Sequence, residues 1–159
     1  MKTTFTSRTP WREKMERPSG PKLIPVPPKM SRFGEGLMLI PTPKLVDSII
    51  RTVPKGKLIT VGAIRKKLAA EYCADVTCPL TTGIFIRIAA EAAEEARANG
   101  AKRVTPYWRV VRDNGELNPK FPGGLKRQRR YLRAEGFAFV RDSKKPMVAE
   151  FERRLFQLD

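Results

Sequence analysis

The chain has 159 residues, 41% of them apolar, so it is long enough to bury one ordinary core and is expected to form one domain. It carries 32 Lys and Arg against 16 Asp and Glu, and its formal charge of +16 makes nucleic acid the first partner to consider, before anionic membrane surfaces. The chain has no histidine and only two cysteines, Cys73 and Cys78, which excludes His-dependent nucleophiles, His-based zinc sites, four-cysteine metal sites and disulfide frameworks.

Membrane and secretory segments are not expected either. No apolar run approaches the roughly 18 residues that span a bilayer, and residues 1–10 lack the apolar region of a secretory signal. We therefore expect a cytoplasmic protein with reduced thiols, nucleoid-associated if it is bacterial. No metal or cofactor is expected, and a monomer is the default.

The N-terminal 43 residues hold eight of the 14 prolines, a density that disfavours helices and central strands. Residues 23–28 are predicted to be extended and polyproline-like. Charge and proline content together favour a solvated, partly disordered arm over residues 1–41. The alternative is an arm that packs on the domain through apolar residues: Trp11, Phe33, Met38, Leu39 and Ile40.

Two helices are predicted after the arm. Thr42 followed by Pro43 is a helix start, with a capping hydroxyl and a proline at the first helical position, and this helix stops at the turn of residues 54–57. Thr60 caps the second helix, which has apolar residues on one side and basic residues on the other.

A third helix is predicted from Pro79 to Ala98, ended by Asn99 and Gly100. Its first half carries Arg87. Its second half carries three glutamates: Glu91, Glu94 and Glu95. Only the first half of this helix, where the helix dipole is also positive, can therefore approach a polyanion.

The remaining chain is predicted to mix short strands and turns with one basic helix. In order, these are a strand (107–112), a turn (113–115), a loop (121–124), a basic helix (125–135), a hairpin (137–140 with 146–149) and a closing helix from residue 150. Three helices followed by a strand, a turn and a glycine loop are the order of a winged helix-turn-helix. We expect a mainly α fold with a small β component, in which such a domain (residues 42–159) follows the Pro-rich extended arm (residues 1–41).

The basic excess lies in two segments. Residues 49–70 contain six basic residues and no acidic one, and residues 109–133 contain eight basic and two acidic residues. Solvated helix faces usually mix both signs, so single-sign clusters favour phosphate contacts. Nucleic acid is therefore the expected partner, and charge alone does not separate DNA from RNA.

Two sequence blocks resemble the DNA-binding domain of the methylated-DNA–protein-cysteine methyltransferases. They are VPKGKLITVGAI at residues 53–64 and TPYWRVVRDNGEL at residues 105–117. They are followed by the glycine loop FPGGLK at residues 121–126 and by the pair Glu135-Gly136 at the end of the predicted basic helix. The resemblance covers about residues 42–137.

The resemblance implies an active site built on Pro-Cys-His-Arg, in which the cysteine takes an alkyl group from a damaged guanine. Here the tetrapeptide is Pro106-Tyr107-Trp108-Arg109, so Tyr107 stands at the position of the nucleophile and Trp108 at that of its base. A phenol with a pKa of about 10 is protonated at neutral pH, and no histidine is present to activate it. Alkyl transfer is therefore not expected.

Other positions of the family's site are either kept or changed. Asn99 stands where the family has an asparagine that supports the active site. Val61 replaces a tyrosine that helps to rotate the target base, and Gly83 replaces the arginine that takes the place of that base. Arg87, one turn later on the same face, is the candidate substitute.

The alkyltransferase-like proteins are a subgroup of this family that lacks the cysteine. They bind alkylated guanine in DNA without repairing it and hand the lesion to other repair factors. The resemblance therefore implies a non-catalytic protein that binds duplex DNA through the minor groove and recognises alkylated guanine to signal repair. Its predicted DNA contacts are Lys55, Lys57, Arg65, Lys66, Thr81, Thr82, Gly83, Arg87, Arg109, Gly123, Gly124, Lys126 and Arg127.

Three alternatives stay open. Tyr107 and Trp108 could wall a pocket in which a base stacks, or their rings could simply fill the core. The protein could be an enzyme with altered base-processing chemistry that uses Glu116 and Glu135. It could also be a degenerate winged helix that binds protein or RNA, with the arm as its docking segment.

Overall fold

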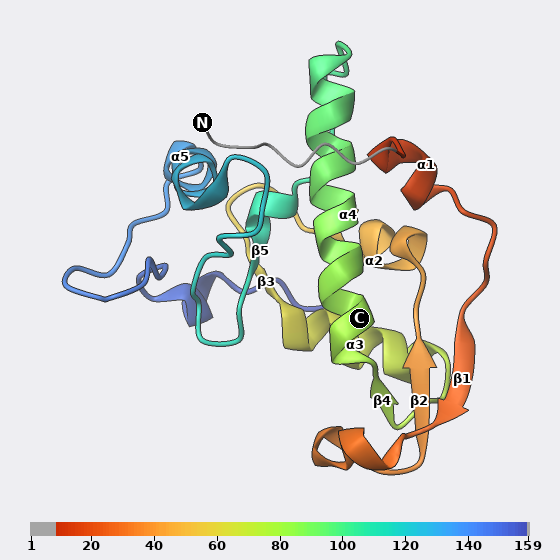
Figure 1. The fold of residues 1–159 in the computed structure, drawn as a ribbon. Coiled ribbons are helices and arrows are strands. Elements are labelled where there is room, and N and C mark those ends of the chain that lie inside the picture. The colour runs from red at the N-terminus through yellow and green to blue at the C-terminus, as the bar shows by residue number, and fades with distance from the viewer. Residues whose placement is uncertain (1–8, 159) are drawn as a thin grey trace, which may run out of the picture.

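The central element of the computed structural model is one long helix, α4 (Pro79–Ala98), against which the three helices that precede it in the chain pack (Figure 1). The structure describes residues 9–158. The first eight residues of the arm, which hold most of the segment tested against a secretory signal, and Asp159 lie outside the described residues. No helix of the described part is long and apolar enough to cross a bilayer.

The two helices predicted from capping signals are confirmed, and so is the third, α4, predicted from its apolar periodicity. α2 (Pro43–Arg51) begins where the Thr42 hydroxyl accepts the Leu45 N–H at 3.2 Å. α3 (Val61–Glu71) begins where the Thr60 hydroxyl accepts the Ala63 N–H at 3.1 Å. Each cap satisfies one of the backbone N–H groups that the first turn of a helix leaves unpaired.

α3 and α4 form the helix-turn-helix, joined by the short strand β4 (Val76–Thr77). α4 buries an apolar face that includes Ile86 and Ala90 in the main core, together with Ile50 of α2 and Leu68 of α3. A second cluster joins the residue before β3 (Ile59–Thr60) to the C-terminal part of the domain and consists of Leu58, Val111, Leu117, Leu132, Phe137 and Val148. The fold is thus the expected mainly α winged helix-turn-helix with a small β component.

The prediction of a solvated arm is wrong for the described residues. β1 (Lys22–Pro25) pairs antiparallel with β2 (Leu37–Ile40), and β2 pairs in parallel with β4, so the arm completes a three-stranded sheet. The connection between β1 and β2 contains the 3-10 helix η1 (Pro28–Phe33). Met38 and Leu39 of β2 are fully buried, and this burial offsets the entropy lost in ordering the chain.

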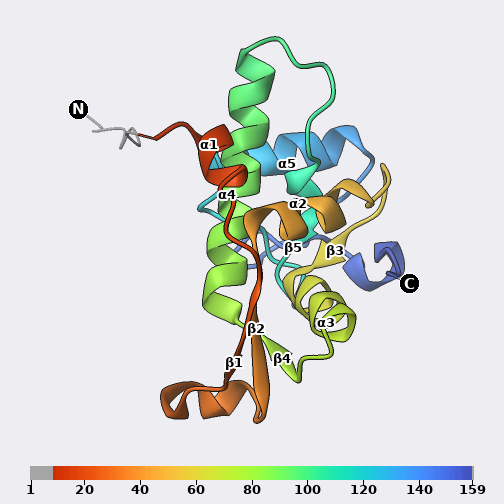
Figure 2. The same cartoon turned by 90° about the vertical axis from the view of Figure 1, so that its right-hand side faces the viewer.

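The arm also contains a short helix, α1 (Trp11–Met15), which packs beside α4 (Figures 1 and 2). It fits between Pro10 and Pro18, so proline density did not exclude it. Glu95 of α4 accepts the backbone N–H groups of Trp11 (3.2 Å) and Arg12 (3.4 Å) at its first turn. The packing alternative for the arm is therefore confirmed for residues 10–41.

The predicted strand over residues 107–112 is only partly correct. Tyr107–Arg109 form a 3-10 turn, η2, and only Val110–Val111 form a strand, β5, which pairs in parallel with β3 (Ile59–Thr60). The Arg109 N–H donates to the carbonyl of Pro106 at 3.0 Å, a local bond that coils the first half of the segment.

The C-terminal third follows the predicted order with shorter elements. α5 spans Gly124–Ala134, and the expected hairpin is reduced to the antiparallel bridge between Phe139 and Val148. The expected closing helix is a 3-10 turn, η3 (Phe151–Arg154). A parallel bridge between Leu58 and Leu155 returns the end of the chain to the start of β3.

Candidate nucleic-acid interface and the buried Tyr107 site

Tyr107 lies in the core, not on a surface. Its side chain is fully buried and makes edge contacts with Phe121 (ring centroids 5.2 Å apart) and Trp108 (5.4 Å). Its hydroxyl donates to Glu94 Oε1 at 2.9 Å. Burial first, and then the hydrogen bond and the charge of Glu94, raise the pKa of Tyr107 far above that of a free phenol, so the hydroxyl stays protonated.

Glu94 of α4 is the acceptor around which this site is built. The Tyr131 hydroxyl donates to the same Oε1 at 3.2 Å. Arg97 and Arg127 approach the carboxylate at 3.5 Å each. Sequence reasoning assigned Glu94 only to an acidic half-helix, because nothing local shows that α5 and η2 meet it there.

Glu135 forms the second polar centre. It accepts the indole N–H of Trp108 at 2.6 Å and pairs with Arg109, whose Nη2 lies 3.0 Å from Oε2. It also accepts the Gly56 N–H at 3.0 Å. Burial alone would raise the pKa of Glu135, but the hydrogen bonds from Arg109, Gly56 and Trp108 outweigh it and lower that pKa below 4.5.

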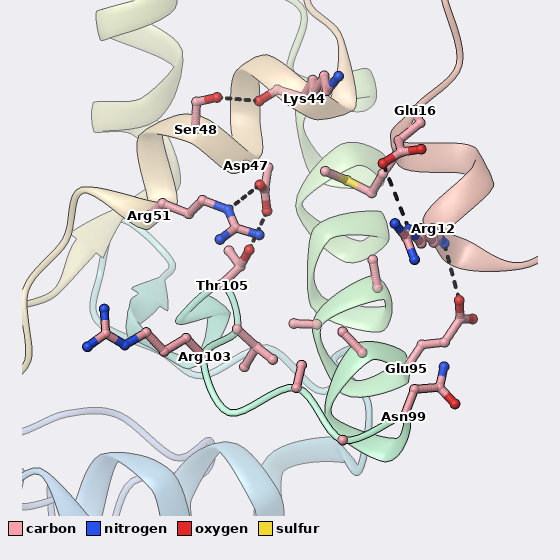
Figure 3. Close-up of a pocket in the computed structure, with 17 residues that line it drawn as sticks. Arg12, Glu16, Lys44, Asp47, Ser48, Arg51, Glu95, Asn99, Arg103 and Thr105 are labelled. Carbon is pink, nitrogen blue, oxygen red and sulfur yellow. Dashed lines mark hydrogen bonds and ion pairs between the residues drawn. The ribbon is translucent and has the colours of Figure 1, made fainter.

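Two further buried polar side chains hold the segment, and sequence reasoning missed both. Gln128 donates to the carbonyl oxygens of Trp108 (3.2 Å) and Val110 (3.0 Å) and accepts the Asn118 N–H (2.9 Å). Asp47 accepts the Thr105 hydroxyl at 2.6 Å and pairs with Arg51 at 2.7 Å, as Figure 3 shows. Gln128 and Asp47 lie on amphipathic helices, and nothing in the sequence distinguishes a buried glutamine or aspartate on such a helix from a solvated one.

The structure does not bring Asn99 to this site. Asn99 is exposed at the end of α4, on the rim of a cavity of about 730 Å³ between α1, α2 and α4 (Figure 3). Within the described residues its side chain makes no hydrogen bond to residues 106–109. The support expected from it comes instead from Glu94, Gln128 and Asp47.

Several predicted DNA contacts are accessible. Lys55, Lys57, Lys66, Gly83, Arg87, Gly123 and Lys126 are exposed. Arg65, Thr81 and Gly124 are half-buried, and the Arg65 Nε donates to the Thr77 carbonyl at 3.1 Å. The accessible residues come from the turn before β3, from α3, from the first half of α4 and from the glycine loop with α5.

Three predicted contacts are already engaged inside the protein. Arg109 is held by Glu135 and by the Val53 carbonyl at 2.7 Å, with only 13% of its side chain exposed. Thr82 is buried and its hydroxyl donates to the Cys78 carbonyl at 2.7 Å. Arg127 is paired with Glu94. Contact of Arg109, Thr82 and Arg127 with DNA stays a prediction, and it would compete with these bonds inside the protein.

Sequence reasoning also missed exposed residues on the same elements. Leu80 (65% exposed) and Ile84 (57%) stand one turn apart on the first half of α4, on either side of Gly83 in the sequence. Arg129, Arg130 and Arg133 of α5 are exposed as well. Hydrophobic periodicity could have found Leu80 and Ile84, because they lie off the buried stripe of the helix.

The chain was compared with protein families and with solved structures, and both comparisons found similar proteins. The family model of the 6-O-methylguanine DNA methyltransferase, DNA binding domain, matches residues 41–137. The crystal structure of S. pombe Atl1 in complex with damaged DNA containing O6-carboxymethylguanine is similar, with 17% identity and a TM-score of 0.51, and the match covers 73% of this chain and 94% of that chain. A structure of S. pombe ATL in complex with DNA has the same identity and coverage and a TM-score of 0.46. No curated protein matches the sequence.

At 17% identity, the likeness to Atl1 shows a shared fold. The family match is of a different kind, because it spans more than half of the chain and contains both sequence blocks and the glycine loop. The chain therefore belongs to the family of the 6-O-methylguanine DNA methyltransferase DNA-binding domain.

Proposed function

We propose that this protein binds double-stranded DNA without transferring an alkyl group, and that it recognises alkylated guanine as a signal for repair. The observation that carries the non-catalytic part is the state of Tyr107. At the position where the resemblance places the nucleophile, the structure has a buried, protonated phenol bonded to a carboxylate.

The neighbouring groups also support a non-catalytic protein. Trp108 stands where the family has its histidine, and an indole N–H donates but cannot accept a proton. The two cysteines lie elsewhere, Cys73 after α3 and Cys78 buried before α4. No accessible group at residues 106–109 can attack an alkyl carbon.

The proposed DNA-binding surface consists of the accessible cations around the helix-turn-helix. Lys55, Lys57, Lys66 and Lys126 are exposed and form no ion pair within the described residues. Each lysine that neutralises a phosphate releases counterions, which favours binding and makes it dependent on salt.

The first half of α4 is the element proposed to enter the minor groove. Gly83 is exposed, and a side chain there would meet nothing within 4 Å, so the helix can approach a partner closely. Leu80 and Ile84 present apolar side chains beside it. Minor-groove proteins use such apolar residues as wedges between base steps.

The lesion to test is O-alkylated guanine, because S. pombe Atl1 is bound to DNA containing O6-carboxymethylguanine. Tyr107 fills the interior at the nucleophile's position, so lesion recognition has to use the surface beside it. Trp108 remains only half-buried there. Repair proteins are the partners proposed downstream, and two unpaired cysteines are compatible with a reducing cytoplasm.

The experiment is fluorescence anisotropy on one duplex, with and without a single O-alkylated guanine, across a salt series. Tighter binding to the damaged duplex is expected, with affinity for both falling steeply as salt rises. Equal affinities would remove the lesion part of the proposal. Absence of binding to either duplex at low salt would overturn the DNA-binding part.

Neither alternative function gains support from the site. Glu135 is fully engaged by three donors, and Glu116 accepts from Asn114 (2.9 Å) in the turn after β5, so they do not form a pair of carboxylates for base chemistry. Within the described part of the arm, α1 packs on α4 and β1 pairs with β2, so neither of these two elements is a free docking segment. Product analysis of alkylated DNA after incubation is expected to find every lesion unchanged.

A further inference from the structure

A second cavity lies beside Trp108, on a side of η2 that neither Tyr107 nor the glycine loop lines. Its volume is about 440 Å³. Its apolar wall is formed by Val104, Pro106 and Trp108. Its polar lining is all basic: Arg51, Arg97, Lys102, Arg103 and Arg109. This volume is in the range of cavities that hold small ligands.

Three of the five cations already have carboxylate partners. Arg51 is paired with Asp47 at 2.7 Å, Arg97 with Glu94 at 3.5 Å and Arg109 with Glu135 at 3.0 Å. These pairs hold the three guanidinium groups in place and neutralise much of their charge.

The other two cations, Lys102 and Arg103, carry the surplus charge of the cavity. Both are exposed, and neither forms an ion pair within the described residues. Figure 3 shows the Arg103 side chain extending away from α4, whereas the Arg51 guanidinium points to Asp47 and Thr105. No carboxylate lines the cavity, so its two free cations suit a doubly charged anion.

The loop that carries Lys102 and Arg103 is anchored next to them. The hydroxyl of Thr105 donates to Asp47 at 2.6 Å, and Pro106 and Val104 are fixed against the core. The cations are thus presented from an anchored loop beside an apolar wall. An arginine fork and a lysine together are the usual receptors for phosphate oxygens.

We propose that this cavity binds a 5′-phosphorylated nucleotide, with the phosphate between Lys102 and Arg103 and the flat base against Val104, Pro106 and Trp108. A nucleotide should bind more tightly than inorganic phosphate, because only the nucleotide has a base that can contact the apolar wall. The cations distinguish the nucleotide from a free nucleoside. The cavity shares Trp108 with the surface proposed for lesion recognition, but its lining contains none of the proposed duplex-binding lysines Lys55, Lys57, Lys66 and Lys126.

The first test uses the fluorescence of Trp108. The chain has two tryptophans, so Trp11→Phe leaves Trp108 as the sole reporter. Titration with deoxyguanosine monophosphate is expected to quench this fluorescence saturably. Deoxyguanosine and inorganic phosphate are expected to bind at least tenfold more weakly. Unsaturable quenching, or equal affinity for the nucleoside, would overturn the proposal.

Matched charge variants separate this site from the duplex surface. Lys102→Ala/Arg103→Ala is expected to lower the affinity for the nucleotide by roughly tenfold or more, because two hydrogen bonds to a charged group are lost. Lys55→Ala/Lys57→Ala removes the same charge from the duplex surface and is expected to weaken duplex binding while keeping nucleotide affinity. An equal loss of nucleotide affinity in both variants would mean unspecific attraction and would contradict the site.

Two sources of the ligand remain to be distinguished, a free nucleotide and the 5′ end of a strand. An oligonucleotide with a 5′-phosphate is compared with the same oligonucleotide with a 5′-hydroxyl. A preference for the phosphorylated oligonucleotide over the mononucleotide assigns the cavity to strand ends, and the reverse assigns it to free nucleotides. Failure of both to bind would overturn the proposal even where duplex affinity is retained.

Discussion

Glu135 shows how one side chain can define a site that sequence alone describes poorly. Its carboxylate is only 8% exposed and is shared by the Trp108 indole, the Arg109 guanidinium and the Gly56 N–H. These donors come from η2 and from the turn before β3, so Glu135 ties the end of α5 to both. Removing one partner of such a buried pair costs far more than removing an exposed charge.

We expect Glu135→Gln to lower the free energy of unfolding by about 3 kcal/mol at pH 7, measured by urea denaturation. The folded-state pKa of Glu135 lies below its ordinary value of 4.5, so its contribution is complete above that value and is lost as pH falls through the lower folded pKa. The difference between variant and parent should therefore shrink in acid.

The matched control is Glu35→Gln, at an exposed position in the arm. It should change stability by less than about 0.5 kcal/mol. Equal stability losses in the two variants would contradict the assigned role of Glu135.

A second residue-scale prediction concerns Tyr107→Cys, which restores the sulfur at the family's nucleophile position. We expect no alkyl transfer from O-alkylguanine DNA, because the site is closed, Glu94 disfavours a thiolate and no histidine is present. Mass spectrometry of the variant after incubation with damaged DNA checks this. A mass gain of one alkyl group would refute it. Tyr107→Phe, which keeps the ring, serves as the unreactive control.

At the scale of elements, the two halves of α4 have different roles. Its second half supplies Glu94 and Glu95, which hold η2, α5 and the arm. Its first half presents Gly83, Leu80 and Ile84 to solvent. A helix that is anchored at one end and exposed at the other can enter a groove without losing its support.

We expect Ile84→Ser to weaken duplex binding by roughly tenfold, because an apolar contact on the order of 1.5 kcal/mol is lost. The slope of affinity against salt should stay unchanged, since no charge is removed. Anisotropy titrations at several salt concentrations measure both quantities. Leu23→Ser on β1, an exposed apolar residue on another element, is the control and should leave affinity unchanged.

At the scale of the whole molecule, the charge of +16 is divided among several surfaces. Some of the 32 basic side chains are paired with acidic residues that the net charge already counts, as Arg109 and Arg127 are. Others remain exposed around the helix-turn-helix, and two cations line the cavity beside Trp108. The position of the unpaired cations on the surface, rather than the net charge, therefore sets the number of phosphates that the protein can contact.

We expect Lys66→Ala to lower the magnitude of the salt slope of duplex binding by about one, as for the loss of one phosphate contact. Lys29→Ala, at an exposed position of η1 in the arm, removes the same charge and should leave the slope unchanged. Equal slopes for both variants would show that binding follows net charge alone and that the proposed surface is wrong.

The starts of α2, α3 and α4 could be predicted from sequence because their signals are local. The caps at Thr42 and Thr60 and the proline at residue 79 lie within one turn of the helices they start. The arm could not be predicted, because proline content is also local whereas β1 and β2 are ordered by pairing with β4 and by burial of Met38 and Leu39.

By itself, the sequence determined that this chain is basic and has no histidine, and the order of its predicted elements and its sequence blocks indicated a winged helix-turn-helix. Residue type and spacing are sufficient for those conclusions. Only the tertiary structure decided that Tyr107 is buried with its hydroxyl bonded to Glu94 and that Arg109 is paired with Glu135. It also decided that Lys102 and Arg103 line the cavity beside Trp108 without an ion pair among the described residues. These outcomes depend on contacts between segments tens of residues apart, and the availability of a charge is a property of its neighbours in space.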